Sequence, residues 1–301
     1  IMHTALGATS IATWISRKAI EDDPDFIAEM KYRNAWADTN NWNTFGDVNY
    51  NQMTAMFNHK IAPLAGYTAK GIIWYQGCNN VGDWRAATDY KRNLKTLVED
   101  WSYWWGREED FPLVYTQLHP AEFNYSPSES LSWFNELLTE LWTENKTTMA
   151  YASNYDVSLV YQGTNFPYSA PCHPITKQPV GERMAKSALW IVYGKDEFED
   201  SIPAILNKME VKKDKILLTF DYVGEGLKIE EGDEELVGFT ICGVDRKFVQ
   251  AYAKIVSKNQ VEVYSPYIKS PVAVAYAFAG MNQESNLMNS QGFPVAAFRT
   301  D

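Results

Sequence analysis

Residues 71–80, GIIWYQGCNN, decide the fold that we expect for this chain. An apolar run that ends abruptly in amide side chains is typical of a buried parallel strand that opens into a polar turn at its carboxyl end. Open α/β sheets bind their ligands at that end of their strands. The stretch therefore predicts a parallel sheet with a reaction centre beside it, close to Gln76, Asn79 and Asn80.

The segments that follow alternate between strand and helix patterns. Apolar runs at 111–118 and 148–157 predict further buried strands, and amphipathic stripes at 89–101, 130–145 and 181–193 predict helices that pack on the sheet. Strands and helices that alternate in this way indicate βαβ units and a parallel sheet.

The start of the chain carries two weaker patterns. Residues 9–28 are amphipathic and predict one helix. The first residues read as the inside of a strand, so we expect the sequence to be a fragment or one product of processing.

Beyond residue 196 the pattern changes. Segments such as 215–220 and 260–264 alternate apolar and polar residues and are separated by turn residues, which predicts an antiparallel sandwich. Acidic residues and Pro203 interrupt the pattern near 195–203. We therefore expect a sheet domain over 1–198 and a β-sandwich over 199–301.

The composition excludes several classes of function. The 301 residues are 46% hydrophobic and 22% charged, and the net charge of -11 argues against nucleic-acid or anionic-membrane partners. We find no apolar run long enough for a membrane span and no signal peptide in the residues given. The 11 tryptophans suit either a Trp-rich core or the stacking of sugar rings, and both interpretations stay open.

The motifs leave little room for metal or nucleotide chemistry. The four histidines, at 3, 59, 119 and 173, show no metal-ligand spacing, and no glycine-rich phosphate loop is present. We expect no cofactor. Acyl transfer and glycoside hydrolysis remain.

Acyl transfer needs a base and donors for the oxyanion. His173 lies in a proline-bracketed loop before a helix and suits the base, although a lone loop histidine is more often ordinary surface. Gln76 and Asn79 are neutral donors, and the turn at Gly7 offers a backbone N–H. The alternative role for Gln76 is an amide that ties two loops together. Asn79 and Asn80 are our candidates for substrate contacts.

Glycoside hydrolysis is the less favoured chemistry. It needs two facing carboxylates. Asp83, Asp156 and Glu182 are candidates, but no motif pairs them.

With these motifs in place, the chain resembles the sialate O-acetylesterases and related carbohydrate acetylesterases, serine esterases of the SGNH type, over nearly its whole length. Residues 59–80 resemble the family's I-A-P-L-x-G-x-x-x-K-G-V-I-W-Y-Q-G-E-S-N block most specifically. Residues 7–14, 173–185 and 286–301 resemble its W-G-G-T-P-x-E-A-W turn, its histidine block and its C-terminal end. The resemblance implies a three-layer α/β/α parallel-sheet domain without its N-terminal strand, followed by a C-terminal antiparallel β-sandwich.

The same resemblance implies roles for single residues. His173 becomes the general base, and Gly7 and Gln76 contribute to the oxyanion hole. The family's nucleophile is the serine of a G-Q-S-N-M motif upstream of the Gly7 turn, and this chain has no such motif. Residues 283–286, QESN, resemble the family's ordinary tail, so we expect Ser285 to be structural.

The chain departs from the family at two positions. Cys78 replaces a glutamate, and Pro171 stands where an acid often orients the histidine; a backbone carbonyl or Asp156 could substitute for that acid. If the two motifs meet, Cys78 and Cys172 are neighbours and could form a disulfide. Two reduced thiols are the alternative, and a nucleophilic Cys78 is a third.

Together these features predict the hydrolysis of O-acetyl esters on sialic acid or another acetylated sugar. The serine would come from an upstream segment or a second chain. The resemblance also implies an extracellular, periplasmic or lysosomal location. A catalytically inactive carbohydrate-binding relative and a structural subunit of a two-chain esterase are the alternatives.

Overall fold

A parallel sheet forms the centre of the N-terminal part. The computed structural model describes residues 1–37, 50–119, 129–157, 174, 176–278 and 285–301. Its three parallel strands, in the order β1-β2-β3, are β1 (Ile72–Trp74), β2 (Leu113–Thr116) and β3 (Met149–Ala152). Each strand falls within an apolar run named above, so these predictions are confirmed.

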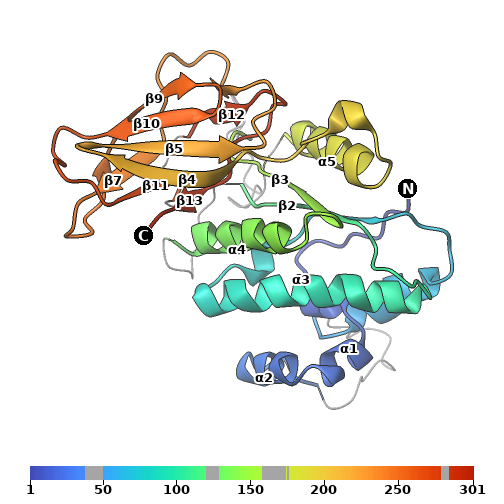
Figure 1. The fold of residues 1–301 in the computed structure, drawn as a ribbon. Helices are drawn as coiled ribbons and strands as arrows, with labels where there is room; N and C mark the ends of the chain where they lie inside the picture. The colour runs from blue at the N-terminus through green and yellow to red at the C-terminus, as the bar shows by residue number, and fades with distance from the viewer. Residues whose placement is uncertain (38–49, 120–128, 158–173, 175, 279–284) are drawn as a thin grey trace, which may run out of the picture.

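Helices cover both faces of this sheet. The long helices α3 (Trp84–Trp104) and α4 (Ser130–Glu144) lie on one face and α5 (Gln178–Ile191) lies on the other (Figure 1). Apolar residues recur along α3 at helical spacing and are buried, among them Tyr90, Leu94 and Leu97. The expected α/β/α layering is therefore confirmed for β2 and β3.

The strand β1 is less buried than its sequence suggests. Ile72 and Trp74 point into the core, whereas Ile73 is 60% exposed and Tyr75 is 37% exposed. The cause is the strand order, because β1 lies at the edge of the described sheet while α5 packs on β2 and β3. The sequence predicted a strand buried on both faces, and this prediction was wrong for the face that carries Ile73.

The first 32 residues form three short helices instead of one. They are η1 (Ile11–Trp14), α1 (Arg17–Asp22) and α2 (Pro24–Tyr32). Ser16 caps the start of α1. Asp23 caps the start of α2, immediately before a proline at the first position of that helix. A new helix therefore begins after each of these two residues. Residues 1–6 form no strand, which corrects the expectation that the chain starts inside one.

The described residues of this part also contain four further short helical segments. They are η2 (Phe57–Ile61), η3 (Ala62–Leu64), η4 (Cys78–Asn80) and η5 (Asp196–Phe198).

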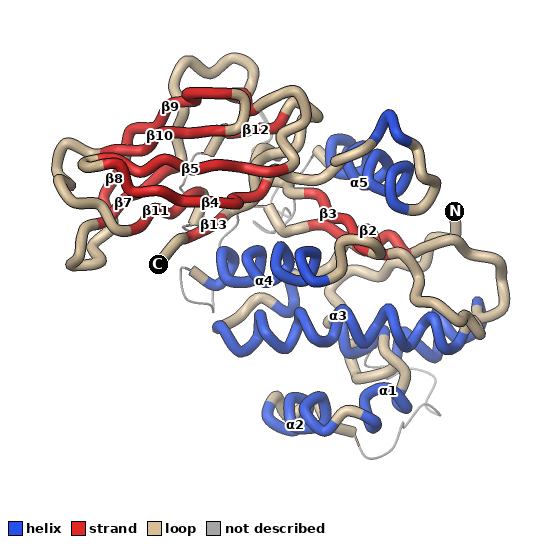
Figure 2. The backbone as a smooth tube through the Cα atoms, viewed as in Figure 1, coloured by secondary structure: helices blue, strands red, loops and turns tan. Residues whose placement is uncertain are grey.

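The C-terminal part is built from antiparallel sheets (Figure 2). One sheet contains β4 (Ile205–Lys212), β5 (Lys215–Asp221), β10 (Gln260–Tyr264) and β9 (Tyr252–Ser257). The other contains β13 (Phe298–Arg299), β11 (Ala273–Tyr276), β7 (Phe239–Cys242) and β8 (Val249–Gln250), and β12 (Leu287–Asn289) pairs with β6 (Leu227–Ile229). Residues from both four-stranded sheets share one apolar core. The expected antiparallel sheets are confirmed, and the limits 1–198 and 199–301 stay a prediction.

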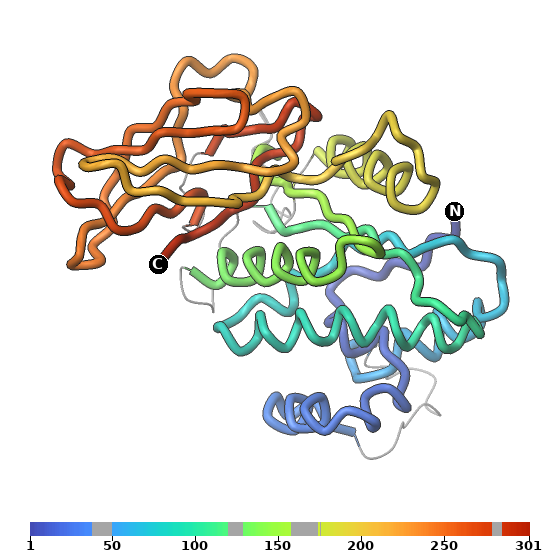
Figure 3. Tube along the Cα trace, viewed as in Figure 1, coloured from blue at the N-terminus to red at the C-terminus, as the bar shows by residue number. Residues whose placement is uncertain are grey.

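The chain returns at its end to the sheet domain. Figure 3 shows the C-terminal residues beside the start of α4. There Arg299 Nε donates a hydrogen bond to Glu136 Oε1 over 3.1 Å. The last strand of the sandwich is thus fixed to a helix of the parallel sheet.

A buried carboxylate fastens α2 to α3. Glu29 is 2% exposed and accepts hydrogen bonds from Arg33 (2.9 Å), Arg92 (2.6 Å) and Asn93 (2.8 Å). Because Arg92 and Asn93 belong to α3, this one side chain joins α2 to residues 63 and 64 positions further along the chain.

We predict that Glu29→Ala destabilises the protein by about 1–3 kcal/mol, because the fully buried Asn93 amide loses its acceptor. Urea unfolding followed by circular dichroism measures the change. Glu21→Ala is the matched control: Glu21 is half exposed and pairs with Arg17, so its loss should cost less than about 1 kcal/mol. Equal effects of the two substitutions would contradict the assignment.

Candidate active site

The turn after β1 is held in a conformation that needs glycine. Gly77 has φ +150°, and a Cβ placed on it would lie 2.8 Å from Cζ of Phe134. The chain then forms η4, with Asn80 N donating to Gly77 O over 2.7 Å. A side chain at position 77 would therefore displace the turn that carries Cys78, Asn79 and Asn80.

The Gln76 amide ties two loops together. Its Nε2 donates to Thr9 O over 2.9 Å and to Asn80 Oδ1 over 2.8 Å. Asn80 Oδ1 also accepts from Ile11 N over 3.1 Å, and Asn80 is 8% exposed. Gln76 therefore holds two loops together, which is the alternative role that the sequence analysis named for it. Its part in an oxyanion hole and the substrate contacts of Asn79 and Asn80 stay predictions.

The segment that carries Gly7 is held beside the same turn. Ala8 has φ +58°, and Asn51 receives a hydrogen bond from Ser10 N over 2.7 Å and donates to Ala8 O over 3.3 Å. Gly7 itself is exposed, with space around the position of a Cβ. Through Thr9, the structure brings the Gly7 segment to the end of β1, and the role of Gly7 in an oxyanion hole stays a prediction.

Two residues support the turn after β1 and the Gly7 segment although the sequence gives no sign of this role. Tyr90 OH donates to Gln76 O over 2.9 Å and accepts from Trp74 Nε1 over 3.0 Å, so it anchors the strand end from α3. Burial raises the pKa of Tyr90 well above its usual range, which keeps the phenol a donor. Asn51 is the other residue. The sequence marks Tyr90 only as core-facing and marks Asn51 not at all, because both contacts join distant segments.

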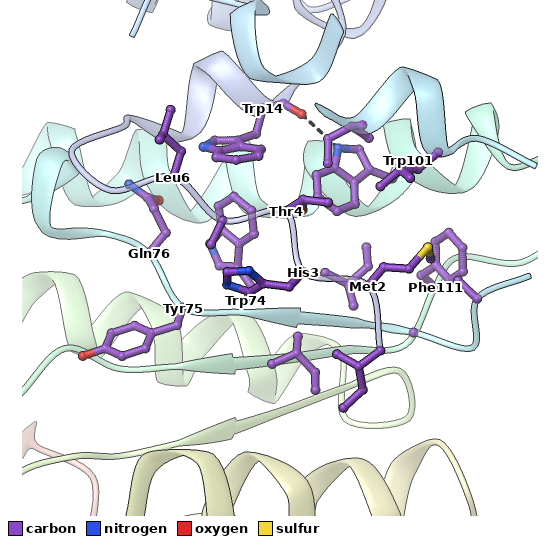
Figure 4. A pocket seen from close by; sticks show the side chains of 18 of the residues that line it. Met2, His3, Thr4, Leu6, Trp14, Trp74, Tyr75, Gln76, Trp101 and Phe111 are labelled. Atoms are coloured by element: carbon purple, nitrogen blue, oxygen red, sulfur yellow. Dashed lines mark hydrogen bonds between the residues drawn. The ribbon is translucent and has the colours of Figure 1, made fainter. Parts of the chain in front are cut away.

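An apolar pocket of about 300 Å³ adjoins Gln76 (Figure 4). The first six residues line it together with β1 and with Trp14 and Trp101. The rings of Trp14 and Trp101 meet Trp74 edge to face at 6.2 and 6.1 Å, and Trp101 Nε1 donates to Trp14 O over 2.9 Å. These three tryptophans are therefore part of the buried core and do not form exposed surfaces on which sugar rings could stack.

His173 lies outside the described residues, as do Cys172 and Pro171. Its role as the base and the disulfide between Cys78 and Cys172 stay predictions. The neighbouring residues are described: Lys177 Nζ donates to Pro174 O over 3.0 Å and lies 5.4 Å from the ring centroid of Tyr75. The segment just after His173 thus contacts the residue just before Gln76.

The carboxylates considered for glycoside hydrolysis have structural partners. Asp83 caps α3 by accepting from Ala86 N over 2.9 Å, and Glu182 is exposed and accepts from Gln178 over 2.7 Å. Asp156 accepts from Arg183 with both carboxylate oxygens. The described contacts of Asp156 are therefore with an arginine, and its suggested part in orienting His173 stays a prediction.

Within the described ranges, no group of three His, Cys, Asp or Glu side chains could hold a metal ion. In the same part of the chain, no helix is long and apolar enough to cross a membrane.

Comparisons with known proteins agree with this architecture. A carbohydrate acetylesterase from Xanthomonas citri has a crystal structure that superposes with a TM-score of 0.76 at 25% sequence identity, covering 98% of this chain and 59% of that one. The fold is therefore that of a carbohydrate acetylesterase. Residues 1–148 match the family model described as carbohydrate esterase, sialic acid-specific acetylesterase. This match covers 148 of the 301 residues.

Named relatives are longer than this chain. The sialate O-acetylesterases of Homo sapiens and Pongo abelii are 26% and 25% identical to it over 239 and 257 residues. These alignments cover 72% and 77% of this chain but 43% and 46% of the relatives. The chain spans less than half the length of the curated relatives that it matches.

We predict that Gly77→Ala destabilises the protein by about 1–3 kcal/mol, because alanine is strained at this φ and its methyl group would press on Phe134. The thermal unfolding midpoint measures the loss. Gly181→Ala in α5 is the control, since nothing lies near its Cβ position and alanine favours a helix. A Gly77→Ala protein as stable as the control would contradict the described turn.

Proposed function

We propose that this chain is one part of an esterase that hydrolyses O-acetyl esters of carbohydrates. The observation that carries the proposal is the contact of Lys177 with the Tyr75 ring at 5.4 Å. Lys177 is the fourth residue after His173 in the sequence, and this contact brings the described segment that follows His173 to the strand end that carries Gln76.

The proposed reaction proceeds through an acetyl-enzyme. The hydroxyl oxygen of a serine attacks the ester carbonyl while His173 takes its proton, and His173 then gives a proton to the departing sugar oxygen. Water, deprotonated by His173, attacks the acetyl-enzyme and releases acetate and the free serine. Each step needs donors for the negative carbonyl oxygen.

Gly7 and Gln76 would serve the oxyanion in different ways. The Gly7 N–H is the direct donor in our proposal. Both Gln76 amide hydrogens are already donated, to Thr9 O and Asn80 Oδ1. Gln76 would therefore contribute by holding the Gly7 segment at the end of β1.

The serine would come from sequence outside this chain, either an upstream segment or a second chain. Two observations support an added segment beside β1. No described strand pairs with its outer side, and Ile73 is 60% exposed on the face of β1 that α5 does not cover. A strand edge left open in this way is a template for pairing with another segment.

In the longer protein that supplies the serine, we predict that Gln76→Ala lowers kcat about 10²-fold, because the Gly7 segment that carries the direct oxyanion donor loses its anchor and is misplaced. Acetate release from an acetylated sugar measures the rate. Gln250→Ala, on an exposed edge strand, is the control and should leave the rate unchanged.

The same assay tests the whole proposal. Acetate release that is lost on substitution of the serine and of His173 supports it. No release from the longer protein would favour the inactive carbohydrate-binding relative, which the departures at Cys78 and Pro171 favour. Hydrolysis of p-nitrophenyl acetate by this chain alone, abolished by His173→Ala, would contradict an external serine.

The open edge gives a further prediction. This chain alone should self-associate, and Ile73→Lys should reduce that association, because a charge at an exposed edge blocks further pairing. Light scattering at matched concentrations measures the effect. Val256→Lys, on an exposed sandwich position of 45% exposure, is the control and should change little. Association unaffected by Ile73→Lys would argue against a docking edge at β1.

A further inference from the structure

A second cleft lies where the sandwich meets the helices α3 and α4. It has a volume of about 390 Å³ and is separate from the apolar pocket beside Gln76. Figure 1 shows β13 and the C-terminus beside α4 at this place. We call it the Trp84 cleft; its polar and aromatic lining includes Trp84, Glu136, Thr139, Glu140, Arg299 and Asp301.

Trp84 offers an aromatic surface at the cleft. It is the first residue of α3 and is 44% exposed, whereas the tryptophans around Trp74 are buried. Its ring meets Trp133 edge to face at 6.3 Å, which fixes its orientation. A fixed, exposed indole suits stacking against the apolar face of a sugar ring.

Arg299 supplies donors beside this ring. Its Cζ lies 5.8 Å from the Trp84 ring centroid, and its Nε donates to Glu136 Oε1 over 3.1 Å. Among the described residues, only this nitrogen of Arg299 has a protein hydrogen-bond partner. The two terminal nitrogens are therefore left for hydroxyl oxygens of a ligand.

The charges of the lining disfavour an anionic ligand. Glu136 already neutralises Arg299. Glu140 is paired with Lys91 at 2.9 Å, and among the described residues Asp301 has no ion-pair partner. A sugar that carries a carboxylate would meet this negative charge, while hydroxyl groups could donate to the same carboxylates.

The cleft also lies close to the proposed reaction centre. Trp84 is the fourth residue after Asn80, so their Cα atoms are at most about 15 Å apart. A sugar bound at Trp84 could belong to the same oligosaccharide whose ester reaches the turn after β1.

We propose that the Trp84 cleft binds sugar units next to the acetylated one, and that it selects neutral sugars over acidic ones. This deepens the proposed function and rests on it. A neutral acetylated polysaccharide is then the substrate class, in preference to glycans that end in sialic acid.

Binding of sugars without acetyl groups tests the cleft separately from catalysis. Isothermal titration of the longer protein with xylohexaose, a neutral probe, should give binding that Trp84→Ala weakens about tenfold, the effect of one lost ring contact of about 1.4 kcal/mol. Arg299→Lys should also weaken it, because lysine lacks the planar pair of terminal donors. The acidic probe 3′-sialyllactose should bind more weakly than xylohexaose.

Trp104→Ala is the matched control. Trp104 is 42% exposed, lies at the other end of α3 and meets Tyr103 edge to face at 5.7 Å. It should leave binding unchanged, with thermal midpoints recorded for all variants. Equal binding by Trp84→Ala and the unsubstituted protein, equal losses for both tryptophans, or tighter binding of 3′-sialyllactose would each overturn the proposal.

The acetate assay distinguishes failure of the proposed esterase activity from failure of the proposed sugar site. Xylohexaose binding that depends on Trp84, without acetate release, would reject the esterase and keep the cleft as a sugar site. Acetate release without Trp84-dependent binding would keep the esterase and reject the cleft.

Discussion

The guanidinium of Arg183 is the interaction on which the two parts of the chain depend. Arg183, on α5, is 6% exposed, binds both oxygens of Asp156 after β3, and donates to Ser153 O. Its Nε donates to Gly292 O in the sandwich over 3.1 Å. A bidentate pair fixes both position and angle, so one side chain sets the end of β3, the start of α5 and the neighbouring sandwich loop relative to one another.

This arrangement has a consequence for the site. In the sequence α5 begins five residues after His173, and Arg183 anchors this helix to the end of β3. Ser153 Oγ donates to Pro294 O over 2.5 Å, and Asn289 Nδ2 donates to Ile202 O over 2.8 Å, which adds two further bonds between the sheet domain, the connection and the sandwich. The sandwich therefore acts as a support for the carboxyl end of the sheet.

The sequence predicts what depends on local periodicity. The strands at 72–74, 113–116 and 149–152 and the helices between them follow from apolar spacing, because each pattern is contained in a single segment. The exposure of Ile73 could not be predicted in this way, since it depends on the order of the strands. The contact of Gln76 with Thr9 spans 67 residues, and that of Arg183 with Gly292 spans 109. Residue types alone suggest such partners but do not select them.

The turn after β1 shows why local and long-range interactions both matter for function. Its shape comes from local chemistry, namely a glycine at φ +150° and an asparagine that closes the turn. Its position comes from long-range bonds, through Tyr90 on α3 and the segment at Thr9 to Ile11. A site that must hold donors within tenths of an ångström needs both, because a rigid turn in the wrong place stabilises no oxyanion. The family likeness covers the local motif, and the three-dimensional network around Gln76 gives it a fixed place beside the Gly7 segment.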